Sequence, residues 1–264
     1  MHTPTSRKRP FQGVRNFRDF GGYTGAGGRR MASGRFFRSA HHALASDADL
    51  DAMAALGIGA IVDLRRPEER TRFPSRRWPG FSAAVIENHD DDEGAGKESW
   101  HGFMAEWDLS PEGIRDYHHR YYERAPTLPR LHDLYARYFR AVADSEGPVV
   151  VHCAAGKDRT GLIVALTHLV AGVHRDDIIA DYLLTNDPQS FAVHAPLWAE
   201  EIAKEKGRAP TMEAMHVAMG VEASYLDRAL QVIAESYGGV DAYLERVLGV
   251  DTALRDRLER KLFD

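Results

Sequence analysis

The stretch from Val149 to Gly161 reads VVVHCAAGKDRTG and gives the strongest indication of the fold. Its first three residues are β-branched and predict a short, buried, central parallel strand. Five residues then separate Cys153 from Arg159, and an apolar, helix-like segment follows Gly161. The stretch therefore predicts a strand, a tight loop and a helix within an α/β fold.

The loop between strand and helix has the features of an oxyanion site. A five-residue loop that closes onto a helix N-terminus points its backbone N–H groups inward, where they can bind an anion about the size of phosphate. The same positive field favours a thiolate, because thiols in such positions titrate at ~3.5 to 7.5 rather than ~8.5. An arginine beside them can hold two phosphoryl oxygens and stabilise their charge. We therefore predict a phosphate-binding loop of Ala154, Ala155, Gly156, Lys157, Asp158 and Arg159, with Cys153 as nucleophile.

The pattern of this loop is unlike one that arises by chance. From average composition, a His-Cys pair followed at these fixed spacings by Gly, Arg, Thr and Gly should occur on the order of once per 10^5 to 10^6 chains of this length. A buried, inert cysteine after a strand is the alternative interpretation. That interpretation leaves the spacing of Gly156, Arg159 and Thr160 unexplained.

Composition excludes several other classes of protein. The chain has 264 residues, a formal net charge of -5 and one cysteine, so it has no internal disulfide and no zinc site with two thiolates. The lone thiol fits a reducing compartment. No apolar run reaches the ~18 to 20 residues of a membrane span, and the mild acidity argues against a nucleic-acid partner. We expect residues 1–12 to be a disordered tail that lacks a secretory signal, and the protein to be cytoplasmic or exported without a recognisable signal.

The order of predicted elements is α/β first and helical afterwards. Gly21 to Gly28 form a glycine-rich turn between two short apolar segments, which predicts a hairpin-like start to the sheet. Ser46 predicts the cap of a helix that stops at Gly57. Further strands are expected at 58–64 and 81–86, and helices at 111–124 and 128–143. Beyond the loop the chain is expected to be helical, with breaks near 187–188, 195–196, 207–210, 220 and 238–239.

The sequence resembles the cysteine-dependent protein tyrosine phosphatase superfamily. It is most similar to the atypical bacterial branch, the tyrosine and lipid phosphatases with His-Cys-x-x-Gly-Lys-Asp-Arg-Thr-Gly loops. Besides the loop, the segments that carry the resemblance are NFRDFGG (16–22), FRS (37–39), IVDLR (61–65), DYLL (181–184) and YGGVDAYL (237–244). The resemblance implies one phosphatase domain over 13–264, a central mostly parallel sheet flanked by helices, and a lid insertion at 188–220 within the helical C-terminal third.

The resemblance also implies a mechanism that needs no metal or cofactor. Cys153 attacks phosphorus, the alcohol or phenol leaves, and water hydrolyses the phosphocysteine. Thr160 would donate a hydrogen bond to the sulfur and help it leave, and His152 would orient the loop. Expected substrates are phosphotyrosine proteins or phosphoinositides, with Lys157 as a second cation for highly charged substrates. One exposed lysine on a loop is the alternative interpretation of Lys157.

The general acid remains open between two aspartates. Trp78-Pro79-Gly80 lacks the carboxyl of the Trp-Pro-Asp loop that many tyrosine phosphatases use. Asp158 lies in the loop and ranks first, although it could instead stabilise a nearby cation. Asp63 ends a predicted strand, where functional groups of α/β sheets gather, but could instead pair with Arg65 or cap a helix.

Other functions and sites are weaker predictions. A pseudophosphatase would use the loop only to bind phosphate, and a rhodanese-like sulfurtransferase would form a persulfide on Cys153. The pairs His41-His42 and His118-His119 lack carboxylates at suitable spacing, so we interpret them as surface histidines rather than metal ligands.

Overall fold

The computed structural model describes residues 11–90 and 100–263. Within them lies a sheet with the strand order β1-β2-β5-β3-β4, in which only β1 pairs antiparallel. The strands are β1 (Arg18–Asp19), β2 (Phe36–Ser39), β3 (Ala60–Asp63), β4 (Ala84–Ile86) and β5 (Val149–His152). The predicted α/β class with a mostly parallel sheet is confirmed.

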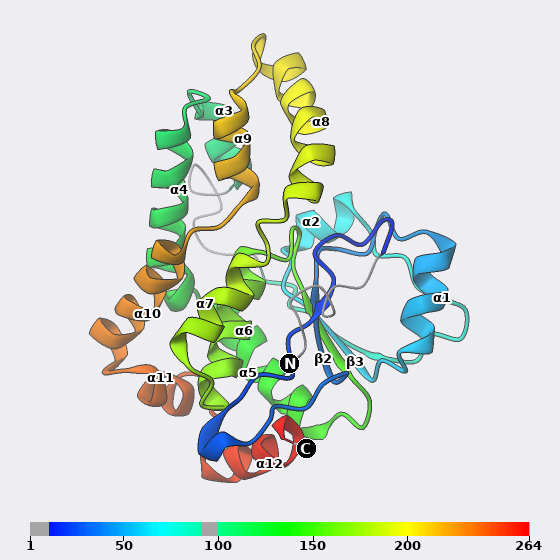
Figure 1. Cartoon of the computed structure of the whole chain (residues 1–264), viewed down its shortest axis with the longest axis vertical. Helices are drawn as coiled ribbons and strands as arrows, with labels where there is room; N and C mark the ends of the chain where they lie inside the picture. The colour runs from blue at the N-terminus through cyan, green and yellow to red at the C-terminus, as the bar shows by residue number, and fades with distance from the viewer. Residues whose placement is uncertain (1–10, 91–99, 264) are drawn as a thin grey trace.

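Alternating side chains of the strands face two apolar layers. Phe37, Ile61 and Val150 pack with α1 (Asp47–Ala55) on one face. Their neighbours along the strands, such as Val62 and Val151, face the larger core formed with α5 (Pro129–Asp144), α6 (Asp158–Val170) and α12 (Thr252–Leu262). Figure 1 shows α1 on one side of the sheet and α5 and α6 on the other. Both faces are thus covered, which is the usual condition of parallel strands.

Local signals in the first part of the chain specify its structure. β1 pairs with β2 across the glycine-rich turn, as the sequence predicts. Ser46 caps α1 in a reciprocal capping box with Asp49, and Gly57 follows the helix with a φ of 64°. The predicted tail lies outside the described residues except for its last two, of which Gln12 donates its N–H to Asp49 Oδ1 at 2.7 Å.

The remaining helices enclose the sheet and extend away from one of its ends. They are α2 (Pro67–Arg72), α3 (Trp100–Glu106), α4 (Pro111–Arg124), α7 (Arg175–Leu183), α8 (Pro188–Lys206), α9 (Met212–Met219), α10 (Ala223–Tyr237) and α11 (Val240–Arg246). Short 3-10 turns lie at Ala26–Gly28 and Ala125–Thr127. In Figure 1, α3, α4, α8 and α9 rise together beyond the sheet. They share an apolar cluster separate from those of the sheet.

The predicted helix break at Ala195-Pro196 is wrong. α8 runs without interruption from Pro188 to Lys206 and contains Pro196. A proline removes one helical hydrogen bond and crowds the carbonyl four residues before it. Here Pro196 and Ala192 are both exposed, so water can solvate the freed carbonyl. The other predicted breaks coincide with helix ends.

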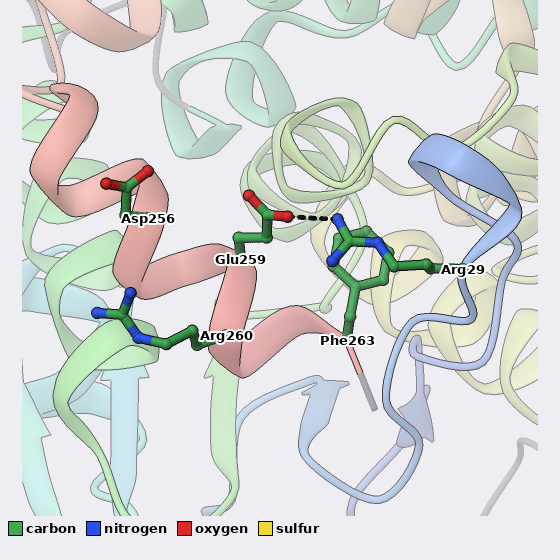
Figure 2. A pocket seen from close by; sticks show the side chains of 5 residues that line it. All are labelled: Arg29, Asp256, Glu259, Arg260 and Phe263. Atoms are coloured by element: carbon green, nitrogen blue, oxygen red, sulfur yellow. Dashed lines mark hydrogen bonds and ion pairs between the residues drawn. The ribbon is translucent and has the colours of Figure 1, made fainter.

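The far end of the molecule has a cavity of about 310 Å³ beside α12. Arg29 lies 4.1 Å above the Phe263 ring and donates to Glu259 at 2.5 Å, and Asp256 and Arg260 complete the lining (Figure 2). None of the predicted site residues is among them. In the described part of the chain, no helix is both long and apolar enough to cross a membrane.

Candidate active site

The loop that follows β5 places the thiol at the start of a helix. Cys153 comes directly after the strand, and α6 begins at Asp158. The Gly156 N–H donates to Cys153 Sγ at 3.2 Å, and the side chain is buried. Cys153 therefore lies in the field of the α6 N-terminus, as the sequence predicts.

Two side chains hold the loop carbonyls on its outer side. Asn16 Nδ2 donates to the carbonyl of Gly156 at 2.7 Å, and Arg38 Nη2 donates to the same oxygen at 2.9 Å. Arg38 also reaches the Lys157 carbonyl at 3.5 Å. A peptide unit whose carbonyl is held on one side directs its N–H toward the other. These contacts therefore favour a loop whose backbone N–H groups point inward, where they can bind an anion.

A buried ion-pair network holds Arg38 in place. Arg38 Nη1 donates to Asp181 Oδ2 at 3.1 Å, and Arg18 Nε lies 3.5 Å from Asp181 Oδ1. Arg18 also donates to Asn16 Oδ1, and burial lowers the pKa of Arg18 to about 9. Removing one member would leave an unpaired buried charge, which costs about 3–5 kcal/mol. Three of the sequence segments that carry the resemblance thus meet behind the loop.

Gly156 is required by the backbone of the loop. Its φ is 69°, in the left-handed region that favours glycine. A Cβ there would lie 2.3 Å from the Ser39 carbonyl oxygen and 2.6 Å from the Ala40 nitrogen. The glycine therefore allows the loop to pack against the end of β2.

Arg159 is held by a residue that the sequence analysis missed. Its Nη1 and Nη2 donate to the two carboxylate oxygens of Glu69 at 2.6 and 2.7 Å, and Nη1 also donates to the Leu64 carbonyl at 3.1 Å. These bonds use three of the five N–H donors of the guanidinium. The Nε–H and one Nη2–H remain on the edge that can hold two phosphoryl oxygens.

Glu69 is fixed by its own helix as well as by Arg159. It is the third residue of α2, where its Oε2 accepts from the Arg66 N–H at 2.8 Å. Burial alone would raise the pKa of Glu69, but the charge and hydrogen bonds of Arg159 lower it to about 2. In the sequence, Glu69 has the pattern of an ordinary helix-capping residue, and nothing links it to a loop ninety residues later.

The two candidate acids lie in different environments. Asp158 is partly buried, accepts from Tyr122 Oη on Oδ1 at 3.0 Å, and has Oδ2 3.8 Å from Lys157 Nζ. Asp63 is buried and accepts from Arg65 Nε and Nη2 at 2.9 and 2.7 Å. Burial opposes ionisation of Asp63, but His152 and Arg65 hold its pKa far below the usual range. The geometry of Asp63 matches the ion pair that the sequence left open, and disfavours a proton donor.

His152, which precedes the loop in the chain, and Thr160, which follows it, are both buried. Thr160 Oγ1 has no hydrogen-bond partner among the described residues, so the hydroxyl is available to another group. The His152 ring packs against the His42 ring at a tilt of 35°, with centroids 4.4 Å apart, and its Nε2 lies 3.6 Å from Asp63 Oδ2. Burial lowers the pKa of His152 to about 4, so the ring is neutral near pH 7. These contacts favour an orienting role for His152.

Comparison with known proteins decides the family. The sequence profile described as "Tyrosine phosphatase family" matches residues 9–264. The chain belongs to the tyrosine phosphatase family. It is therefore a phosphoric monoester hydrolase.

Three relatives of this tyrosine phosphatase support the assignment. A Cupriavidus necator protein, named as a candidate tyrosine-protein phosphatase, is 34% identical to this chain over 247 residues. The match covers 92% of this chain and 85% of the relative. The triple specificity protein phosphatase PtpB of Mycobacterium tuberculosis is 32% identical over 277 residues, covering 95% and 97%. A tyrosine-protein phosphatase of Nostoc commune is 26% identical over 224 residues, covering 80% and 69%.

Lys157 of this phosphatase points away from solvent. It is 6% exposed, so the interpretation as an exposed loop lysine is wrong. Its Nζ donates to the carbonyls of Ala218 and Gly220 at 2.7 and 3.1 Å and lies 3.3 Å from His118 Nε2. Those carbonyls belong to the C-terminal end of α9, where a cation is favourable. Lys157 thus joins the phosphate loop to α9.

A helix of the predicted lid segment contacts the surroundings of the loop. The Arg15 guanidinium lies 5.1 Å from the centroid of the Trp198 ring on α8. The Arg15 carbonyl accepts from the Ala40 N–H at 2.9 Å, and the next residue, His41, donates its N–H to the Ala154 carbonyl at 3.2 Å. The contact between Arg15 and Trp198 therefore lies beside the phosphate loop.

The interpretation of the histidine pairs as surface residues is wrong for one member of each pair. His42 is buried between Ser39 and His152, and His118 is buried beside Lys157. Each supports the site from behind, a role that the sequence spacing does not reveal. Among the described residues, no three His, Cys, Asp or Glu side chains are grouped to hold a metal ion.

Proposed function

We propose that Cys153 is the nucleophile with which this phosphatase cleaves phosphomonoesters. The Sγ–P bond forms as the bond from phosphorus to the ester oxygen breaks, and the leaving oxygen takes a proton from Asp158. Water then attacks phosphorus, the Sγ–P bond breaks, and Asp158 recovers a proton. The observation that carries the proposal is the thiol at the N-terminus of α6, beside an arginine whose outer edge remains open.

Asp158 is the proposed general acid, in preference to Asp63. Tyr122 donates to Oδ1 of Asp158, so a transferable proton belongs on Oδ2. Asp63 is held ionised by Arg65, and a permanently ionised carboxylate has no proton to give. Thr160, with its unpartnered buried hydroxyl, would stabilise the sulfur as it leaves phosphorus.

The proposed substrates are phosphotyrosine proteins, with activity toward phosphoserine, phosphothreonine or phosphoinositides as an extension. The relative from Mycobacterium tuberculosis carries the name of a triple specificity phosphatase, which supports broad use of this site. The contacts of Lys157 with α9 argue that it does not bind a second substrate phosphate in this arrangement. Phosphotyrosine, which carries a single phosphate, is therefore the first substrate to test.

The segment 188–220 is the proposed lid. α8 and α9 lie beyond the sheet in Figure 1 and touch the site through Trp198 and the end of α9. Cys153 is 2% exposed, and movement of this segment would widen the approach of a phosphotyrosine side chain to the loop. Such a cover would exclude water during transfer.

The deciding experiment compares the wild type with Cys153→Ser on phosphotyrosine peptides, phosphoserine peptides and phosphoinositide vesicles. We expect phosphate release from phosphotyrosine by the wild type and none by the variant, which should still bind vanadate. Equal phosphate release by both proteins would refute the assignment of Cys153 as the nucleophile.

Leaving-group dependence separates the two aspartates. We expect Asp158→Asn to slow hydrolysis of phenyl phosphate by roughly 10^2-fold or more, because phenolate needs a proton as it leaves. The loss should be much smaller with an aryl phosphate whose phenol is strongly acidic. Asp63→Asn is the matched control and should lower both rates alike. A leaving-group dependence confined to Asp63→Asn would reverse the assignment.

A further inference from the structure

Two adjacent tyrosines of α4 pack against each other beside Asp158, and only one of their hydroxyls has a hydrogen-bond partner among the described residues. Tyr122 Oη donates to Asp158 and lies 2.6 Å from Tyr182 Oη. Tyr121 packs edge-on against Tyr122, with ring centroids 5.6 Å apart. Its own hydroxyl is buried and forms no hydrogen bond with any residue in 11–90 or 100–263.

Tyr121 is joined to the phosphate loop through its neighbour Tyr122. Burial is the largest cause of a raised pKa at Tyr121, Arg159 acts in the opposite direction, and Asp158 and Cys153 raise it further. Geometry gives the position: Tyr121 packs on Tyr122, which donates to Asp158 of the loop, and Tyr121 also packs against the apolar cluster that contains Cys153. The raised pKa means that the hydroxyl stays protonated at neutral pH.

A buried hydroxyl without a partner needs an explanation. Leaving a polar group unsatisfied in the interior costs about 1–3 kcal/mol. Phenylalanine would fill the same volume without that cost, so packing alone does not account for the hydroxyl of Tyr121. An acceptor that arrives with the substrate would account for it, because the phosphoryl group brings three charged oxygens to this place.

We propose that the Tyr121 hydroxyl donates a hydrogen bond to a non-bridging phosphoryl oxygen and so acts as a further catalytic residue. The inference rests on the proposed function of Cys153 and adds a side-chain donor to the backbone amides and Arg159. Tyr121 transfers no proton, since Asp158 supplies the proton for the leaving group. Its contribution is greatest when charge accumulates on the transferring phosphoryl group.

The test is Tyr121→Phe, with Tyr243→Phe as the matched control. Tyr243 lies in α11, is fully buried, and its hydroxyl also has no partner among the described residues. Both variants thus lose one buried, unpartnered hydroxyl. We expect kcat/KM for an aryl phosphate to fall by roughly 10- to 100-fold in Tyr121→Phe, in the lower part of the range for lost oxyanion donors. The control should stay within about twofold of the wild type, because the Tyr243 ring packs against His132 and Tyr237.

A second measurement distinguishes a phosphoryl contact from a structural effect. Vanadate resembles the transferring phosphoryl group, so Tyr121→Phe should bind it more weakly by a factor comparable to the loss in kcat/KM. The melting temperatures of both variants should remain equal to that of the wild type or higher. Wild-type vanadate affinity, or kcat/KM within about twofold of the wild type, in Tyr121→Phe would overturn the inference.

Failure of the proposed function has a different signature. If the wild type and Cys153→Ser release phosphate equally, the catalytic role of Cys153 is refuted, and vanadate affinity still decides whether Tyr121 contacts the bound anion. If the wild type is active and Tyr121→Phe retains full activity, only the role of Tyr121 is refuted.

Discussion

At the residue scale, Arg159 has two tasks that depend on different edges of one guanidinium. The end with Nη1 and Nη2 is anchored by Glu69, and none of these bonds uses the Nε–H or the second Nη2–H. An arginine held on one edge loses little conformational entropy when it binds phosphate with the other. Glu69 is therefore a positioning residue that acts through Arg159.

Replacing Glu69 tests this division of tasks. In Glu69→Gln, one of two charge-assisted bonds to Arg159 is lost, and we expect kcat/KM for an aryl phosphate to fall by roughly tenfold or more, which is ~1.4 kcal/mol or more of transition-state stabilisation. Glu68→Gln is the matched control, because Glu68 is its neighbour in α2 with a side chain 58% exposed. Steady-state kinetics of both variants provide the check. Equal kcat/KM in the two variants would show that Arg159 does not need its anchor.

The sequence predicts the residues of the site that are close together in the chain. The spacing from Cys153 to Arg159 specifies the loop because strand, turn and helix N-terminus are local structures. The sequence does not predict Glu69 and Tyr121, because they approach the loop only through the packing of distant segments. It predicts Lys157 as a member of the loop, but it does not predict the contacts of Lys157 with α9.

At the element scale, α8 has an exposed and a covering side. Val193 and Leu197 are 59% and 55% exposed, while Trp198 turns toward Arg15. A guanidinium over an aromatic ring stabilises by about 0.5–1 kcal/mol at exposed sites and more when desolvated. A contact of this strength can hold a cover in place and still release it on substrate binding.

Removing the Trp198 ring should open the cover more often. We expect Trp198→Ala to increase the rate of Cys153 alkylation by iodoacetamide by roughly threefold or more, equivalent to a change of ~0.6 kcal/mol or more in the opening equilibrium. The chain has a single cysteine, so total thiol loss reports this site alone. Leu197→Ala, a change in the adjacent exposed residue, should leave the rate unchanged. A rate in Trp198→Ala no higher than in Leu197→Ala would argue against α8 as the cover.

Helix boundaries were predicted where local chemistry ends a helix and missed where it does not. Ser46 and Gly57 bound α1 through a cap and a left-handed residue. Pro196 was expected to end a helix, yet α8 continues through it because the affected turn faces solvent. Exposure of a single turn depends on the tertiary arrangement, which periodicity in the sequence does not contain.

At the scale of the whole molecule, the site rests on neutral, buried histidines. The rings of His42 and His152 pack against each other next to the start of the loop, and His118 lies beside Lys157. Burial lowers the pKa of all three, to about 4 for His152. These three histidines therefore bind protons less readily in the folded state than in the unfolded chain.

Stability should consequently decline in mild acid. The pKa of His152 falls from an ordinary 6.5 to about 4 on folding, so the unfolded state binds more protons between these values. The contribution of neutral His152 to the free energy of unfolding is complete above pH 6.5 and is lost as the pH falls toward 4. About 2 kcal/mol is lost at pH 5. Glu69, with a pKa of about 2, titrates below this window. Urea unfolding at pH 7.5 and pH 5 should show the loss, which His42→Gln should reduce. His174→Gln, at a side chain 74% exposed, should retain the loss of stability at pH 5. An unfolding free energy that is equal at both pH values would mean that folding does not suppress the protonation of these buried histidines.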